Sequence, residues 1–167
     1  MRRVTIAATS AVALFVCGSA GAGKVNIPKE GSYEVDFCPV GHGKTLSNPD
    51  KIFVMSYDLD AVLRTTPADR PFDRMGARCY GLYTNLNGKQ AETGVCELTD
   101  QDGDKWWMDY HGNADGAGGT YTSAGGTGKY DGMTLRGEYR IDNAWGSPAK
   151  DVAFVGCNPN KGTYKLK

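Results

Sequence analysis

Apolar and polar residues alternate along short stretches of this chain, and the clearest alternation lies at residues 133–141. There, apolar or small residues occupy the odd positions and polar or charged residues the even ones, which is typical of a β-strand with one buried face. Residues 119–124 have the composition of a partner strand, and the glycine-rich residues 125–132 can turn the chain between the two. Because two strands alone are not stable in water, further strands must complete a sheet.

The same reading predicts six further strands, separated by turn residues at hairpin-like spacings. They are at residues 32–38, 51–59, 77–84, 91–99, 105–111 and 151–157. Eight antiparallel strands can close into an up-and-down barrel, which leaves no exposed sheet edge. The predicted fold class is therefore all-β, a single eight-stranded antiparallel up-and-down barrel.

The connections between these strands carry their own expectations. Residues 23–31 should be an unpaired arm, residues 39–43 (PVGHG) should end the first strand, and the chain from Asn158 onward should be a polar tail. The longest irregular connection is residues 60–75, with room for one helical turn at 61–64. Long connections often carry function, so this loop would form the rim of the barrel.

The N-terminal segment, residues 1–22, has the pattern of a secretory signal peptide. Two arginines precede an apolar run at 4–17, and Ala20-Gly21-Ala22 provides a small-residue exit. An alternative makes Cys17 a lipoprotein acceptor, although the preceding Val16 is not small. We therefore expect a periplasmic or secreted barrel domain at residues 23–167. No later segment approaches 18 consecutive apolar residues, so no membrane insertion is expected.

The cysteines predict two disulfides that staple the barrel. Five are present, and the four outside the leader form an even set in an exported chain. A two-residue hairpin turn at 87–88 (NG) places Cys79 opposite Cys96, at a non-hydrogen-bonded position where side chains approach closely. Cys38 and Cys157 then remain to join the first and last strands, which are neighbours in a closed barrel.

The charge balance excludes one class of partner. The leader removes Arg2 and Arg3 from 19 basic residues, which leaves 17 against 19 acidic residues and a net charge of −2. Nucleic acid and anionic membrane surfaces are bound by clustered Lys and Arg, so neither is expected as a partner.

Residues 94–141 resemble a known pattern. The run GGTGKYDGMTLRGEY, preceded by GVCELTDQDGDKWWMDY, looks like that of small secreted bacterial proteins of unknown role. These resemble the barrel shared by allene oxide cyclases and dirigent proteins. The resemblance implies turn-forming roles for the matching glycines, which are Gly125, Gly126, Gly128 and Gly132. No catalytic residue of a cyclase can be placed on this sequence, and the fold alone does not imply the activity.

Three aspartates, Asp100, Asp102 and Asp104, form a dense acidic cluster that suggests calcium. An EF-hand loop requires Gly at its sixth position and an acid at its twelfth, but these positions hold Lys105 and His111. We predict a solvated hairpin turn and no metal site, with a weak calcium site of another geometry as the alternative.

One strand, residues 105–111, holds the candidate site residues. His111 shares a face with Asp109 and Trp107, and an inward Asp–His pair would be capable of acid–base work. Trp106, Met108 and Tyr110 share the other face, which the alternation favours as the core. The catalytic candidates are therefore His111 and Asp109, and the candidate aromatic ligand contacts are Trp106, Trp107 and Tyr110. His42, the other histidine, is expected on the surface.

Three functions suit such a barrel, none of which calls for a cofactor. The first is non-enzymatic binding of a small apolar or amphipathic molecule, the second a cyclase- or isomerase-like enzyme with a barrel active site, and the third a structural or protein-interaction module of the cell envelope. A cavity of about 300 Å³ or more would keep the first two, whereas a barrel packed solid would leave the third. A convergent polar pair in the cavity would favour the enzyme.

Overall fold

The computed structural model describes residues 27–48, 51–142, 145–146 and 152–167. The predicted leader at residues 1–22, including Cys17, lies outside the described residues. The strands and one short 3₁₀-helix follow one another in the order β1 Glu30–Asn48, β2 Ile52–Arg64, β3 Gly76–Leu86, β4 Lys89–Thr99, β5 Lys105–Gly112, β6 Gly118–Gly126, η1 Gly128–Tyr130, β7 Thr134–Arg140, β8 Trp145–Gly146, β9 Val152–Val155 and β10 Asn158–Lys165.

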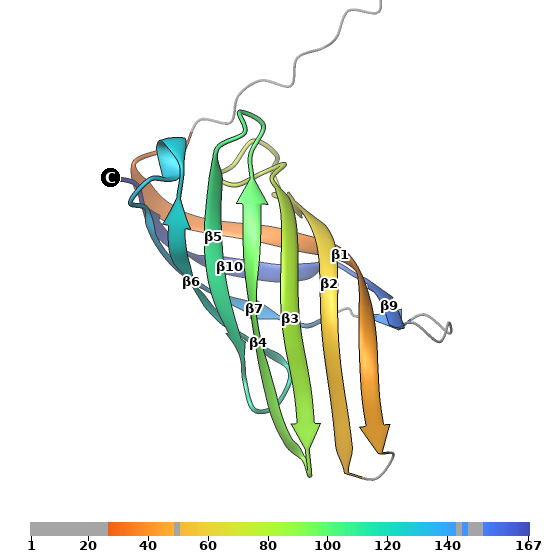
Figure 1. Cartoon of the computed structure of the whole chain (residues 1–167). Helices are drawn as coiled ribbons and strands as arrows, with labels where there is room; N and C mark the ends of the chain where they lie inside the picture. The colour runs from red at the N-terminus through yellow and green to blue at the C-terminus, as the bar shows by residue number, and fades with distance from the viewer. Residues whose placement is uncertain (1–26, 49–50, 143–144, 147–151) are drawn as a thin grey trace, which may run out of the picture.

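Eight of these strands form a closed antiparallel barrel, and Figure 1 shows how they are arranged. Strands β1 to β7 pair in sequence order, β10 pairs with β7, and β10 also pairs with β1 to close the ring. The residues that alternate toward the interior are the apolar ones, as in β5, where Trp106, Met108 and Tyr110 are all buried. The predicted eight-stranded barrel is confirmed.

The eighth barrel strand differs from the prediction. The predicted strand 151–157 contains β9, which pairs with Val40–Gly43 in the far half of β1 and lies outside the ring. The ring is closed instead by β10, in the predicted polar tail. Along β10 the inward positions hold Asn160, Gly162 and Tyr164. Only one of these side chains is large and apolar, so the sequence of β10 shows no clear alternation of apolar and polar residues.

Strand β1 is longer than predicted at both ends. It begins within the predicted arm and continues through residues 39–43, which do not end it. The glycines here allow close approach rather than a turn: a Cβ at Gly41 would lie 2.7 Å from the Phe154 ring, and one at Gly43 would lie 2.8 Å from Met55. Strand β2 likewise runs to Arg64, so residues 61–64 are extended and not helical.

The loop 65–75 plugs one end of the barrel. Phe72 is only 1% exposed and makes edge contacts with Tyr33 and Tyr164, each at 5.0 Å between ring centroids. Buried Asp73 supports the loop, since its carboxylate accepts the backbone N–H groups of Thr65 and Asp69. The loop was predicted to form the rim of the barrel, but it fills the interior at this end as a plug. The ends of β1 and β10 lie beside it, where Glu30 pairs with Lys165 (Figure 1).

Both predicted disulfides are present. Cys79 and Cys96 are cross-strand partners in β3 and β4, with Cα atoms 4.0 Å apart and side chains 1% and 2% exposed on the inner face. Cys38 and Cys157 also have Cα atoms 4.0 Å apart. This second bridge lies where β1 changes partner from β10 to β9.

Candidate functional site

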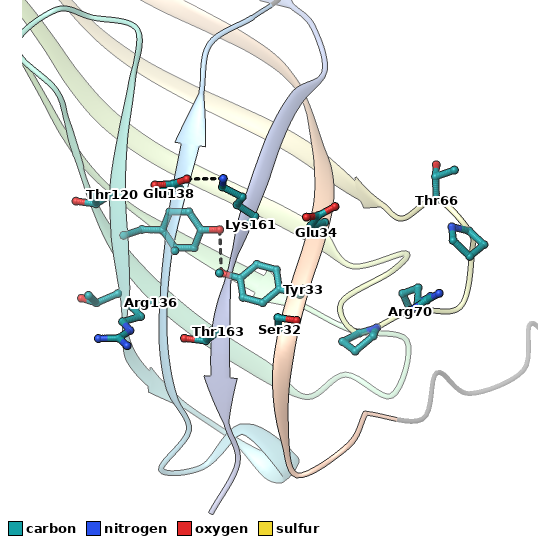
Figure 2. A pocket seen from close by; sticks show the side chains of 16 residues that line it. Ser32, Tyr33, Glu34, Thr66, Arg70, Thr120, Arg136, Glu138, Lys161 and Thr163 are labelled. Carbon is teal, nitrogen blue, oxygen red and sulfur yellow. Dashed lines mark hydrogen bonds and ion pairs between the residues drawn. The ribbon is translucent and has the colours of Figure 1, made fainter.

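In the described part of the molecule, one hollow lies on the outer wall and another lies inside the barrel. The outer hollow, of about 830 Å³, lies over β1, β6, β7 and β10 beside the plug loop (Figure 2). Its walls carry outward, polar side chains, among them the ion pair of Lys161 Nζ with Glu138 at 2.9 Å. It is lined by Ser32, Tyr33, Glu34, Thr66, Pro67, Arg70, Pro71, Thr120, Tyr121, Thr122, Arg136, Gly137, Glu138, Lys161, Gly162 and Thr163.

The inner hollow occupies the half of the barrel opposite the plug and measures about 410 Å³. Its walls are mainly aromatic and aliphatic side chains that point inward from the strands. They are Phe37, Pro39, Phe53, Met55, Tyr57, Leu59, Cys79, Tyr83, Glu92, Cys96, Met108, Tyr110, Gly116, Tyr121, Tyr139, Ile141, Phe154, Val155, Gly156, Asn158 and Asn160. A concave, mainly apolar cavity with a few convergent polar groups is the usual form of a small-molecule site. The lumen is therefore the candidate site, and no residue of the plug loop lines it.

The polar part of the lumen is a chain of tyrosine hydroxyls that ends on one carboxylate. Tyr57 donates a hydrogen bond to Glu92 Oε1 at 2.5 Å, and Tyr139 donates to Oε2 at 2.7 Å. The hydroxyl of Tyr110 lies 2.7 Å from that of Tyr57. A phenol has one proton to donate, and Tyr57 uses its proton on Glu92, so Tyr110 is the donor to Tyr57. All three hydroxyl protons are thus directed toward Glu92.

The environment keeps these tyrosines protonated. Burial, then the neighbouring Tyr110 and Glu92, raises the pKa of Tyr57 well above its usual value. Burial and Glu92 also raise the pKa of Tyr139 and that of Tyr110. At neutral pH the three phenols are therefore hydrogen-bond donors, and Glu92 is the acceptor on which they converge.

Glycine makes room for these rings at one rung of the β3–β4 pair. Gly81 and Gly94 are cross-strand partners on the inner face. A Cβ at Gly81 would lie 2.3 Å from the Tyr110 hydroxyl, and one at Gly94 would lie 2.2 Å from the same atom. These two positions must lack a side chain because the Tyr57–Tyr110 pair occupies the space that a Cβ would fill.

A second tyrosine pair follows the same plan nearer the plug. Tyr33 donates to the Tyr121 hydroxyl at 2.8 Å, a bond drawn in Figure 2. Gly137 and Gly162 face each other across β7 and β10, and a Cβ at either would meet the Tyr33 hydroxyl at 2.5 and 2.7 Å. This pair separates the lumen from the outer hollow, since Tyr121 lines both.

The site residues predicted on β5 are divided by the barrel wall. Tyr110 lines the lumen, whereas Trp106 is buried near the plug, 5.7 Å from Phe72 between ring centroids. His111 and Asp109 lie on the outer face, with side chains 64% and 45% exposed, and His111 Nε2 is 3.5 Å from Asp109 Oδ2. Trp107 is on that outer face as well, so the predicted group does not meet at one site.

The acidic turn is built around a lysine. Lys129 Nζ lies 2.7 Å from Asp100 and 2.9 Å from Asp102, and the backbone N–H of Lys129 donates to Asp104 at 3.2 Å. The three carboxylates therefore hold the η1 corner in place. Within the described residues, no group of three or more His, Cys, Asp or Glu side chains is placed to hold a metal ion.

Glu92 was absent from the sequence-based candidates, although a signal for it existed. Residues of β4 alternate, so Glu92 must share the inner face with Cys96, four residues away. The same count from Cys79 places Tyr83 inward on β3. Since the Cys79–Cys96 pairing was itself predicted, the parity of the hairpin would have pointed to an inward carboxylate.

Comparisons with known proteins concern the fold of this chain. Neither a scan of protein-family models nor a search of curated proteins finds a match. One solved structure similar to this chain is that of a pterocarpan synthase dirigent protein, with a TM-score of 0.51 and 12% sequence identity, over 85% of this chain and 94% of that one. The fold is a dirigent-type barrel. This agrees with the fold that the resemblance of residues 94–141 implied.

Two features of the structure concern the cellular environment of the protein. Two disulfides suit an oxidising environment. Among the described residues, no helix has the length and apolar character needed to span a bilayer.

Proposed function

We propose that this protein is an exported β-barrel, periplasmic or secreted, that binds a small, largely apolar or amphipathic molecule in its lumen without transforming it. The observation that carries the proposal is the cavity of about 410 Å³, whose wall is mostly aromatic and aliphatic and whose polar groups converge on Glu92. An apolar molecule gains free energy by leaving water for such a wall, and the polar cluster orients it. The leader-like residues 1–22 and the two disulfides support the export.

The similarity to a dirigent-type barrel supports this reading at the level of fold. A rigid barrel suits binding because its interior side chains are held by closed sheet pairing on all sides. Little ordering is then required when a ligand enters, and so less of the interaction free energy is lost.

The test uses a neutral, apolar fluorescent probe, phenylnaphthylamine, whose emission rises in an apolar environment. We expect saturable binding with one site per barrel. Ile141 lines the cavity and is 37% exposed, so it lies at the mouth. Ile141→Trp should therefore reduce the affinity by about tenfold or more. Val95, 50% exposed on the outer wall, supplies the matched control, and Val95→Trp should leave the affinity unchanged. Equal effects of the two variants, or no saturable binding, would refute lumen binding.

One observation favours a second function, an enzyme of the cyclase or isomerase type. Glu92 with Tyr57 and Tyr139 is a convergent polar group inside the cavity, which is the feature that an acid–base site would need. In such an enzyme Glu92 would take a proton from the substrate, and the tyrosine hydroxyls would stabilise developing negative charge on it.

Native mass spectrometry of protein purified from its source distinguishes the two functions. The ligand retained by the wild type and by Glu92→Gln would be compared by mass and by chromatographic retention. A binder yields one compound from both proteins. An isomerase yields compounds of equal mass and different retention, because the variant retains unconverted substrate.

A further inference from the structure

The lumen has an uncompensated charge of one sign. Among the described residues that line it, Glu92 is the only Asp, Glu, Lys, Arg or His. Its partners within the described chain are hydroxyls of tyrosines, and no described Lys, Arg or His forms an ion pair with it. The two hydroxyls use one lone-pair direction on each oxygen, and a carboxylate has about four. Glu92 therefore retains capacity to accept hydrogen bonds.

The wall around this carboxylate is made of aromatic rings. Three ring pairs line the cavity: Tyr57 with Phe154 at 5.9 Å, Tyr110 with Tyr139 at 6.2 Å and Phe53 with Tyr83 at 5.9 Å, all edge-to-face. In such pairs the edge of one ring meets the face of the other, and ring faces carry partial negative charge. Aromatic faces attract cations, and they do so more strongly where water is excluded.

From these observations we infer that the molecule bound in the lumen is a cationic amphiphile, with an ammonium group at Glu92 and an apolar body against the rings. This inference rests on the proposed lumen binding and specifies its ligand class. An ammonium has donors and charge to satisfy Glu92, whereas an anion would be repelled by it and would find no basic side chain among the lining residues that the structure describes. A neutral hydroxyl would gain a hydrogen bond but no charge pairing.

The test compares three compounds that share one ring system and differ in the charged end: naphthylethylammonium, naphthylethanol and naphthylacetate. Each displaces phenylnaphthylamine from the wild-type barrel near neutral pH and low salt. We expect the ammonium to bind roughly 10- to 100-fold more tightly than the alcohol, and the carboxylate to bind most weakly. Added salt should narrow this difference in affinity only partly, because Glu92 is partly buried and a partly buried pair is screened less than an exposed one.

Two variants test whether Glu92 causes the preference for the ammonium compound. Glu92→Gln keeps the size of the side chain and removes its charge, so the advantage of the ammonium should fall to within about threefold of the alcohol. Glu138→Gln makes the same change on the outer wall, where Glu138 is 57% exposed and paired with Lys161, and should leave the ranking unchanged. If Glu92→Gln does not fold, the wild-type ranking still decides, because it requires no variant.

The outcomes separate the two proposals. If the alcohol equals or exceeds the ammonium in the wild type, or if the ammonium keeps its advantage in Glu92→Gln, the cationic ligand is refuted while lumen binding stands. If phenylnaphthylamine itself does not bind, the proposed function is refuted and the ligand class with it.

Discussion

Replacement of Phe72 tests whether the loop 65–75 is a structural plug. Phe72 is 1% exposed and lies within 6.3 Å of four other aromatic rings, measured between centroids. Removal of a buried phenylalanine ring costs about 3–5 kcal/mol, because apolar burial is lost and a cavity remains. A domain of this size is stable by about 5–15 kcal/mol. We therefore expect Phe72→Ala to remove about a fifth or more of the free energy of unfolding.

The backbone conformation of Phe72 also predicts which of two substitutions, Phe72→Gly or Phe72→Ala, gives the more stable protein. Its φ is 67°, in the left-handed region, where a residue with a Cβ pays about 1–2 kcal/mol and glycine does not. Glycine usually destabilises a protein more than alanine does, by about 0.5–1 kcal/mol. Here the order should reverse, with Phe72→Gly more stable than Phe72→Ala by roughly 0.5–1 kcal/mol.

Urea unfolding measures both effects, with tryptophan fluorescence as the signal since Trp106 lies 5.7 Å from Phe72. Phe53→Ala is the matched control, because Phe53 lines the open lumen and is only half-buried. It should cost less stability and should weaken binding of phenylnaphthylamine, which Phe72→Ala should leave within about twofold. A loss below about 1 kcal/mol for Phe72→Ala would refute the plug, as would a larger effect on binding than on stability.

Three further predictions concern the glycines, the disulfides and the tyrosines. Gly81→Ala should cost about 1–3 kcal/mol by overpacking, because the new Cβ would lie 2.3 Å from the Tyr110 hydroxyl, whereas Gly76→Ala, with no atom within 4 Å, should be neutral in the same thermal unfolding assay. Removing the Cys38–Cys157 bridge, with 119 residues of separation, should cost about 5 kcal/mol, against about 3 for Cys79–Cys96 with 17; equal losses in urea would contradict the loop-entropy reasoning. Burial raises the pKa of Tyr121 to about 12, although its bond to Tyr33 opposes the rise, so its stabilising contribution is complete below about pH 10 and is lost above it. Unfolding free energies near pH 9 and pH 11 should show this fall, and Tyr121→Phe should make it shallower.

The strand plan was largely predictable because strand alternation and one strong turn signal are local properties. The NG turn at 87–88 fixed the parity of β3 and β4, and the same pairing brought Cys79 opposite Cys96. The errors came from residues whose role depends on distant partners. Gly41 and Gly43 suggested a break, but they lie in a strand because Phe154 and Met55 pack against them. The polar β10 is a strand because β1 and β7 pair with it on both sides, and propensity does not report such pairing.

The candidate site was less predictable than the fold. Alternation predicted that Trp107 lies on the face opposite Trp106 and Tyr110, and the structure places it on the outer wall, so these three candidate contacts do not line one cavity. Glu92 becomes a site residue only when β5 and β7 bring Tyr110 and Tyr139 around it. A site inside a barrel is assembled from many strands, and its residues are therefore scattered along the chain.

The position of the C-terminal strand β10 has a practical consequence. Glu30 and Lys165 are neighbours at the end of the barrel that the plug loop fills. The mouth of the cavity is at the other end, where Ile141 and Phe154 line it. A tether attached at the C-terminus, such as an affinity tag on a sensor surface, would hold the molecule by its base. Every immobilised copy would then present its entrance to the solution, so the barrel is suited to surface-based screening of small molecules without redesign.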